Sequence, residues 1–231
     1  MNKNIFITGG TSGIGKALIN EFAKNNYNIF FTYYKNFNQA KLISRELNKY
    51  NIQHGFSKMD LSKVNSIENA FRKFKSHFNE LNIFISNASP TINRESFLKL
   101  KSEDIFKSIN ASLVGNIIVI KNALEILSKK KKSQAVIINI SSYSAISGGK
   151  NIHLYAAAKS ALNTLCKALS KDKFKKKIKI LSILPRYIDT PTFRKNNNIK
   201  NNIDLRIFIK SKKIKKIKTS YQFARLICKK I

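Results

Sequence analysis

NIFITGGTSGIG, at residues 4–15, joins a short apolar run to a glycine-rich turn, and the residues that follow, KALINEFAKNN, have helical periodicity. This order of strand, turn and helix suits a pyrophosphate, because glycines let the backbone approach it at the positive end of the helix. Gly9, Gly13 and Gly15 carry the pattern. We therefore predict that the turn binds a dinucleotide.

Five further strands are predicted downstream: NIFFTYY from Asn28, then residues 54–59, 82–86, 135–141 and 177–185. Helical patterns separate them, and this alternation predicts an α/β fold, a Rossmann-like doubly wound parallel sheet of six strands with helices on both faces. Such sheets bind ligands beyond the carboxyl ends of their strands. The residues that fall at those ends are Gly13, Asp60, Asn87, Ser142 and Ile188.

Two of the predicted helices contain notable polar residues. Ser62 precedes an amphipathic run to residue 78 and is expected to cap that helix. Asn110 stands among apolar neighbours in the helical pattern of residues 102–127. We expect it to be buried, with a hydrogen-bond partner that is structural or catalytic.

NISSYSAISGGKNIHLYAAAK, at residues 139–159, brings together a hydroxyl, a phenol and an ammonium group. Tyr155 and Lys159 are four residues apart in a helical run, so they share one face, and a neighbouring cation lowers a phenol's pKa. Ser142 follows a buried strand and is expected to reach the same substrate oxygen. In a lysine-rich chain the Tyr–Lys spacing alone is weak evidence, since a tyrosine merely packed on a helix would look the same.

The composition excludes several classes of function. The net charge of +32 is almost entirely excess lysine spread along the whole chain, which indicates compositional drift rather than a nucleic-acid-binding patch. No segment approaches the 18 or more apolar residues of a membrane helix, and no signal peptide is recognisable. Cys166, Cys228 and the three histidines have no metal-ligand spacing. We expect one domain over residues 1–231, in the cytoplasm, without a metal.

Taken together, TGGTSGIG, the Asn-Ala at residues 87–88, Asn110, Ser142, Tyr155 and Lys159 resemble the short-chain dehydrogenase/reductase family in order and spacing, over about residues 3–192. In character the chain looks nearest to 3-oxoacyl-carrier-protein reductases.

The resemblance implies a role for each matching residue. Tyr155 would exchange the carbonyl proton, Ser142 would bind the substrate oxygen, and Lys159 would lower the tyrosine pKa and hold the nicotinamide ribose. Asn110 would support a water-linked proton relay. Asp60 and Leu61 would meet the adenine, Asn87 the adenine-side ribose, and Ile188 and Thr190 the carboxamide. The full predicted cofactor set is Gly9, Thr11, Ser12, Gly13, Ile14, Gly15, Lys35, Asp60, Leu61, Asn87, Ala88, Tyr155, Lys159, Pro185, Ile188 and Thr190.

The second strand suggests which nicotinamide cofactor is preferred. An NAD enzyme usually has an acidic residue near the end of this strand to hold the ribose hydroxyls. Residues 32–35 here are Thr, Tyr, Tyr and Lys, with no carboxylate. The missing acid and the presence of Lys35 favour NADP(H) over NAD(H), although Lys35 could equally be one of many background lysines.

The sequence departs from the family at three places. Ser89 replaces the glycine of Asn-Ala-Gly, Arg186 replaces the glycine after Pro185, and we expect the usual seventh strand to be absent. Residues 193–218 form a short substrate-loop region. A homodimer through the helix that carries Tyr155 is expected, and a tetramer is left open.

Several functions are compatible with these features. The leading hypothesis is reduction of a small-molecule or carrier-bound carbonyl, with 3-oxoacyl thioesters as candidate substrates. The alternatives are a sugar or polyol oxidoreductase of polysaccharide synthesis and a dinucleotide-binding protein without catalysis. Loss of a catalytic residue would indicate the last, yet all four candidates are present.

Overall fold

The computed structural model describes residues 2–90, 94–129, 134–172 and 177–231. Its strands are β1 (Asn4–Ile7), β2 (Asn28–Tyr33), β3 (His54–Lys58), β4 (Ile83–Ser86), β5 (Ala135–Ile140), β6 (Ile178–Ile183), β7 (Ile188–Asp189) and β8 (Lys218–Thr219). Its α-helices are α1 (Gly13–Lys24), α2 (Phe37–Leu47), α3 (Val64–His77), α4 (Ser102–Ile109), α5 (Gly115–Ser128), α6 (Ser144–Ser147), α7 (His153–Leu169), α8 (Pro191–Asn196), α9 (Asn202–Ser211) and α10 (Ser220–Cys228).

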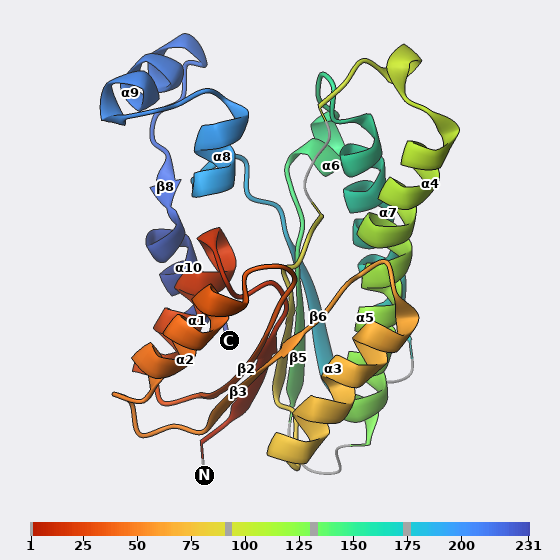
Figure 1. Ribbon diagram of the computed structural model, residues 1–231, viewed down its shortest axis with the longest axis vertical. Coiled ribbons are helices and arrows are strands. Elements are labelled where there is room, and N and C mark those ends of the chain that lie inside the picture. The colour runs from red at the N-terminus through yellow and green to blue at the C-terminus, as the bar shows by residue number, and fades with distance from the viewer. Residues whose placement is uncertain (1, 91–93, 130–133, 173–176) are drawn as a thin grey trace.

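Six parallel strands form the central sheet in the order β3-β2-β1-β4-β5-β6. The order reverses between β1 and β4, which pair from Ile5 with Ile83 to Ile7 with Ile85. Helices α1, α2 and α10 cover one face of the sheet, and α3, α5 and α7 cover the other (Figure 1). The prediction of a doubly wound, Rossmann-like sheet is therefore confirmed.

Alternate residues of each central strand enter two separate cores. Ile5 and Ile7 belong to the core beneath α1, α2 and α10, whereas Phe6 between them belongs to the core beneath α3, α5 and α7. A strand buried on both faces reads as a continuous apolar run, as residues 5–7 and 135–138 do. In the second core Phe6 and Phe74 stack with their ring centres 5.3 Å apart.

A single helical rod passes through α4, a π-helical turn at Asn110–Val114 and α5. Within the described residues this rod, Ser102–Ser128, is long and apolar enough to cross a membrane, so the expectation that no segment reaches that length is wrong. Val119, Ile120 and Ala123 are fully or almost fully buried in the second core. The apolar face of α5 is thus explained by packing on the sheet.

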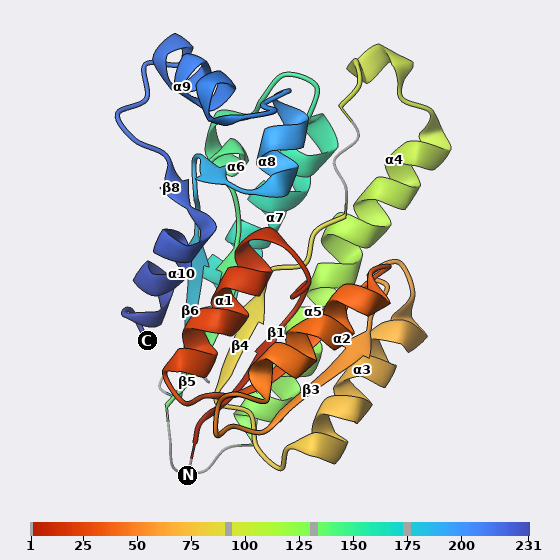
Figure 2. The same cartoon turned by 60° about the vertical axis from the view of Figure 1, so that its left-hand side comes forward.

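The C-terminal part returns to the first core (Figure 2). Helix α10 packs along α1, and Phe223, Ala224 and Ile227 are buried there. Its first turn is held by a capping box between Thr219 and Gln222. Among the described residues the large sheet takes up no seventh strand, as expected, and β7 and β8 pair separately.

One expected cap is not formed. Helix α3 begins at Val64, and Lys63 is its cap residue, without a side-chain hydrogen bond. Ser62 instead donates from its hydroxyl to Asp60 Oδ1 at 2.7 Å. The prediction that Ser62 caps the helix is wrong, because the helix begins at Val64 and Ser62 lies one residue before the cap position.

Candidate active site

The glycine-rich turn after β1 leaves no room for side chains. Gly9 and Gly13 have positive φ angles of 70° and 52°. A Cβ on Gly15 would lie 2.0 Å from the Gly9 carbonyl oxygen, so helix α1 can start this close to the turn only with glycine. The first turn of α1 contains no acidic residue. Its free N–H groups therefore offer a site for an anion such as a pyrophosphate.

Asn87, directly after β4, fixes this turn. Its side-chain Nδ2 donates to the main-chain oxygens of Thr8 and Gly9 at 2.9 and 3.0 Å. The main-chain N–H groups of Asn87 and Ala88 both donate to Thr8 Oγ1 at 2.9 Å. The Asn-Ala pair thus joins β4 to the glycine turn, and the contact of Asn87 with a ribose stays a prediction.

Ser142, Tyr155 and Lys159 converge as predicted at the end of β5. Ser142 follows the strand, and α7 presents Tyr155 and Lys159 on the face toward it. The Lys159 Nζ atom donates to the Ile140 main-chain oxygen at 2.8 Å and lies 5.8 Å from the centre of the Tyr155 ring. Tyr155 and Ser142 are within side-chain hydrogen-bond reach of each other. Two hydroxyl groups and an ammonium therefore face one space.

Burial governs the acid–base properties of this group. Burial raises the pKa of Tyr155, and the hydrogen bond with Ser142 lowers it by less. The expectation that Lys159 brings the tyrosine pKa down is wrong for this structure, because the ammonium is turned toward Ile140. Burial also lowers the pKa of Lys159 to about 8. A lysine in that range is still mostly protonated at neutral pH.

A cavity of about 500 Å³ extends from these three side chains across the ends of the strands. The predicted site residues that line it are Ile14, Asn87, Ser142, Tyr155, Lys159, Pro185, Ile188 and Thr190. Ser89, at the first departure from the family pattern, lines it as well. Nucleotide-turn and catalytic candidates thus share one cavity.

Other predicted cofactor residues lie outside that lining. The turn residues Gly9, Thr11, Ser12, Gly13 and Gly15 surround the start of α1 without lining it, and Ala88 is likewise behind the wall. Lys35 is exposed after β2, with its Nζ 5.4 Å from the centre of the Tyr34 ring.

The β3–α3 loop, with Asp60 and Leu61, also lies away from the cavity. Burial alone would raise the pKa of Asp60, but hydrogen bonds from Ser62, together with Lys63 and Lys58, lower it. The carbonyl of Leu61 stands where a Cβ on Gly115 would be, 2.0 Å away, so the loop packs closely on α5. This loop is therefore an ordered and ionised element at the edge of the sheet.

The environment of Asn110 differs from the one predicted. It is exposed rather than buried, and its Nδ2 donates to the Ser62 main-chain oxygen at 3.3 Å. The π-helical turn that starts at Asn110 shifts the helix register, so the side chain leaves the apolar face. The buried amide of this rod is Asn116, which accepts from Ser86 Oγ at 3.2 Å and donates to the Ser112 oxygen at 2.9 Å.

Two residues that the sequence analysis did not assign to the site belong to its wall. Ser144 donates to Ser142 Oγ from both its main-chain N–H, at 3.2 Å, and its hydroxyl, at 2.8 Å. Arg186 lies over the rings of Tyr143 and Tyr187, with its Cζ 5.1 and 5.6 Å from their centres. The spacing Ser-x-Ser after a buried strand is a signal that could have identified Ser144.

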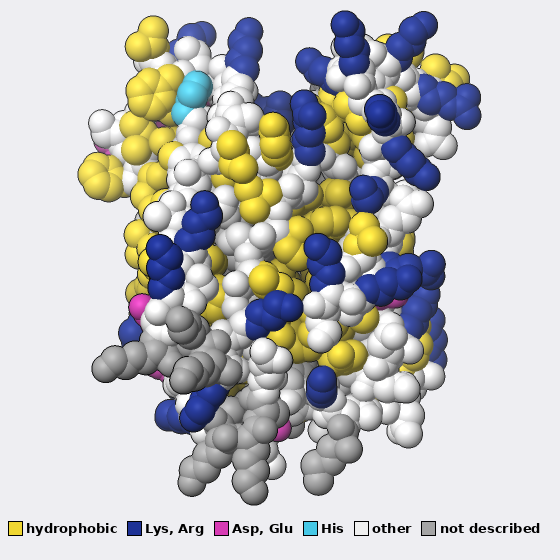
Figure 3. Space-filling model, turned by 180° about the vertical axis from the view of Figure 1, so that it is seen from behind, with side chains coloured by type: hydrophobic (Ala, Val, Ile, Leu, Met, Phe, Trp, Pro, Cys, Tyr) yellow, Lys and Arg dark blue, Asp and Glu magenta, His cyan; other side chains and the backbone are white. Residues whose placement is uncertain are grey.

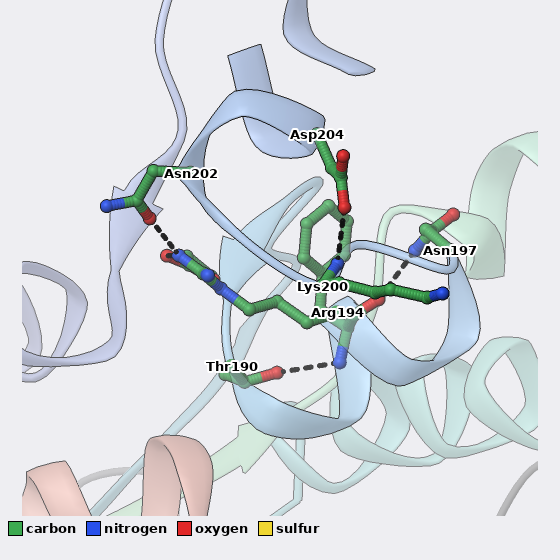
Figure 4. A network of polar contacts seen from close by, with 8 residues as sticks. Thr190, Arg194, Asn197, Lys200, Asn202 and Asp204 are labelled. Atoms are coloured by element: carbon green, nitrogen blue, oxygen red, sulfur yellow. Dashed lines mark hydrogen bonds and ion pairs between the residues drawn. The ribbon is translucent and has the colours of Figure 1, made fainter. Parts of the chain in front are cut away.

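The far wall of the cavity is built by α8 and α9. Phe208 packs edge to face on both Tyr187 and Phe193, with the Phe193 and Phe208 ring centres 5.4 Å apart, and the Tyr187 ring is tilted against Phe193. Figure 4 shows the polar network beside them, in which Arg194 forms a bidentate pair with Asp189 at 2.7 and 2.8 Å and reaches Asn202. The segment after β7 is therefore internally braced.

Basic side chains are dispersed over the face of the molecule that Figure 3 shows. Lys and Arg side chains stand there at many separate points, with hydrophobic and uncharged side chains between them. This distribution supports the interpretation of the net charge as compositional drift.

Comparison with known proteins gives consistent results. A family model described as short chain dehydrogenase matches residues 3–201. The chain is 30% identical over 203 residues to a 3-oxoacyl-(acyl-carrier-protein) reductase of Chlamydia trachomatis, covering 87% of this chain and 80% of that protein. It is 28% identical over 208 residues to the reductase of the same name from Mus musculus, covering 89% and 84%.

Solved structures agree with the fold. One described as ElxO with NADP bound is 28% identical, with a TM-score of 0.79 over 98% of this chain and 90% of that one. Levodione reductase, at 18% identity and a TM-score of 0.87 over 98% and 89%, shares the fold.

Proposed function

This chain belongs to the short-chain dehydrogenase family, and on that premise we propose that it interconverts a carbonyl and an alcohol with NADP(H), its main candidate substrates being 3-oxoacyl thioesters. The observation that carries the proposal is the placing of Ser142, Tyr155 and Lys159 around one cavity that also reaches Ile14 and Thr190. The catalytic group thus faces the space next to the nucleotide turn.

Each catalytic side chain has one chemical task. Tyr155 gives its phenolic proton to the substrate oxygen during reduction and accepts it during oxidation. The Ser142 hydroxyl donates a hydrogen bond to the same oxygen, because Ser144 already occupies its acceptor side. Lys159 holds the catalytic helix against the end of β5 through its hydrogen bond to the Ile140 oxygen, and it lines the same cavity, where it would hold the nicotinamide ribose. Asn110 stays a prediction as the relay residue.

The residues present fit a nicotinamide dinucleotide. The glycine turn is so close to α1 that a side chain on Gly15 would collide with the Gly9 carbonyl, and the first turn of α1 has no acidic residue. Both features suit a pyrophosphate. Ile188 and Thr190 line the cavity on the side where a nicotinamide amide would be held. When bound, the cofactor supplies hydride at its nicotinamide ring.

The preference for NADP(H) rests on the end of β2. Lys35 and Tyr34 are exposed there, and no carboxylate stands among residues 32–35. A ribose phosphate would find a cation, whereas free ribose hydroxyls would find no acidic acceptor.

The choice of substrate is supported by the relatives. Two reductases named for 3-oxoacyl groups on acyl carrier protein match more than four-fifths of this chain. A predominantly basic surface would also attract an acidic carrier. Our proposal therefore includes both small and carrier-bound carbonyls.

The proposal also covers the assembly. We expect residues 1–231 to act as one domain, with 193–218 as the substrate-loop region, in a cytoplasmic homodimer formed through the helix that carries Tyr155. Light scattering of the purified protein tests the dimer, and a monomeric mass would contradict it.

Cofactor titration tests the function itself. Titrating purified protein with NADPH and with NADH, followed by nicotinamide fluorescence, should show saturable binding that is tighter for NADPH. Acetoacetyl thioesters should then oxidise the bound cofactor. Absence of binding to either cofactor would reject the proposal, and binding without turnover of any carbonyl would favour a non-catalytic dinucleotide protein.

A further inference from the structure

Arg186 lines the same cavity as the catalytic serine. Its chain position is fixed, because the main-chain N–H of Tyr143 donates to the Pro185 oxygen at 2.9 Å. Tyr143 follows Ser142 in the chain, and the Arg186 guanidinium lies over the Tyr143 ring. The Arg186 cation is therefore held beside the segment that contains Ser142, where the substrate carbonyl would bind.

The guanidinium is oriented but unpaired. Tyr143 and Tyr187, from two different segments, present their rings to it, an arrangement that favours a cation. Within the described part of the chain it has no hydrogen-bond acceptor and no carboxylate partner. A ring-bound guanidinium keeps its N–H donors at its edge, where they suit the paired oxygens of a carboxylate or phosphate.

The charges around the cavity have one sign. Arg94, Lys150 and Lys212 line it together with Arg186, and the described residues of its lining include no Asp or Glu. Two carboxylates, Glu95 and Asp104, line a separate hollow of about 40 Å³ on another side of Tyr155. An anionic part of a substrate would thus be drawn into this cavity.

We propose that Arg186 is a specificity-determining residue that binds an anionic group of the substrate, a carboxylate or a phosphate. This inference rests on the proposed function, because it concerns the substrate of the same site. It narrows the substrates to carbonyl compounds that carry such a group, either beside the carbonyl or on the arm of a carrier.

Two matched substrate pairs test the proposal and separate the two sources. Acetoacetyl coenzyme A is compared with the neutral acetoacetyl N-acetylcysteamine thioester, and levulinate with its methyl ester. The kcat/KM of each is measured with saturating NADPH for the wild type, Arg186→Gln and Arg186→Lys. Arg45→Gln is the control, because Arg45 on α2 is exposed, as Arg186 is, but lines neither cavity.

The decisive quantity is the kcat/KM of the charged substrate divided by the kcat/KM of its neutral counterpart. Losing a charge-assisted hydrogen bond should lower that ratio about tenfold or more in Arg186→Gln. Arg186→Lys should recover part of it, and Arg45→Gln should leave it as in the wild type. If the ratio falls for the thioester pair alone, Arg186 binds a phosphate. If it falls for the levulinate pair alone, Arg186 binds a carboxylate. Ratios within twofold of the wild type in both pairs would overturn the inference.

A binding measurement separates this inference from the proposed function. Calorimetry with levulinate and with phosphopantetheine, against levulinate methyl ester and pantetheine, requires no turnover. Weaker binding of a charged probe to Arg186→Gln than to the wild type supports the inference even if no carbonyl is reduced. Equal binding to both proteins overturns it, whatever the activity.

Discussion

The ammonium group of Lys159, buried on α7, donates a 2.8 Å hydrogen bond to the main-chain oxygen of Ile140, the last residue of β5. This bond ties the catalytic helix to the strand that carries Ser142. It also leaves a cation in a space with little water, and burial lowers the pKa of Lys159 from 10.5 to about 8. The site therefore contains a group that costs stability.

The cost should depend on pH in a defined direction. Between pH 8 and 10.5 the unfolded chain binds more protons at Lys159 than the folded chain, so the unfolding free energy of the wild type rises with pH there. Below pH 8 the full penalty, at most about 3 kcal/mol, is present. Lys159→Met should therefore gain in stability relative to the wild type at pH 7, and this gain should shrink toward pH 10.

Urea denaturation of both proteins at pH 7, 8, 9 and 10 measures the difference. The packing of methionine sets a constant offset, whereas the change of the difference with pH reports on Lys159. A difference that is flat over this range would show that Lys159 titrates normally in the folded protein.

Lys35 should distinguish the two cofactors. Lys35→Ala removes the cation beside the proposed ribose phosphate and should weaken NADPH roughly three- to tenfold while leaving NADH almost unchanged. Lys49→Ala is a matched control, because Lys49 also lies over a tyrosine ring, with its Nζ 5.2 Å from the Tyr50 centre, at the far end of α2. Fluorescence titration gives both dissociation constants, and an unchanged ratio would make Lys35 background charge.

Ser144 should act through Ser142. Its main-chain and side-chain donors both point to Ser142 Oγ, so Ser144→Ala removes one of two groups that orient this hydroxyl. We expect kcat to fall about threefold to tenfold with KM almost unchanged, and Ser142→Ala to cost about 100-fold. Steady-state kinetics with the best substrate measures both parameters. An effect of Ser144→Ala on KM alone would show that Ser144 acts in substrate binding instead.

The sheet was predictable because its strands are buried on both faces. Residues 5–7, 83–85 and 135–138 read as unbroken apolar runs, and the glycine turn indicated where the first helix starts. Ser142, Tyr155 and Lys159 could be brought together from the chain order alone, since a strand end and the following helix must meet at one edge.

The wrong predictions concern residues whose position depends on where a helix begins, on a local change of helix register or on the direction of a side chain. Ser62 was expected to cap α3, but the helix begins at Val64, one residue later than that cap requires. Asn110 lies in an apolar pattern of helical period, but the π-helical turn rotates it out of the buried face. The Tyr155 pKa depends on where the Lys159 amine points, and the Ile140 carbonyl that attracts it is not visible in a spacing.

The central claim is that Tyr155 transfers the proton, and that the cavity binds the cofactor whether or not the Tyr155 hydroxyl is present. The most direct measurement is Tyr155→Phe, which removes a hydroxyl and little volume, followed by NADPH titration and by NADPH oxidation with a carbonyl that the wild type reduces. The account predicts a dissociation constant for NADPH within about twofold of the wild type and a fall in kcat of about 100-fold or more. Turnover near the wild-type rate, or loss of NADPH binding together with activity, would contradict it.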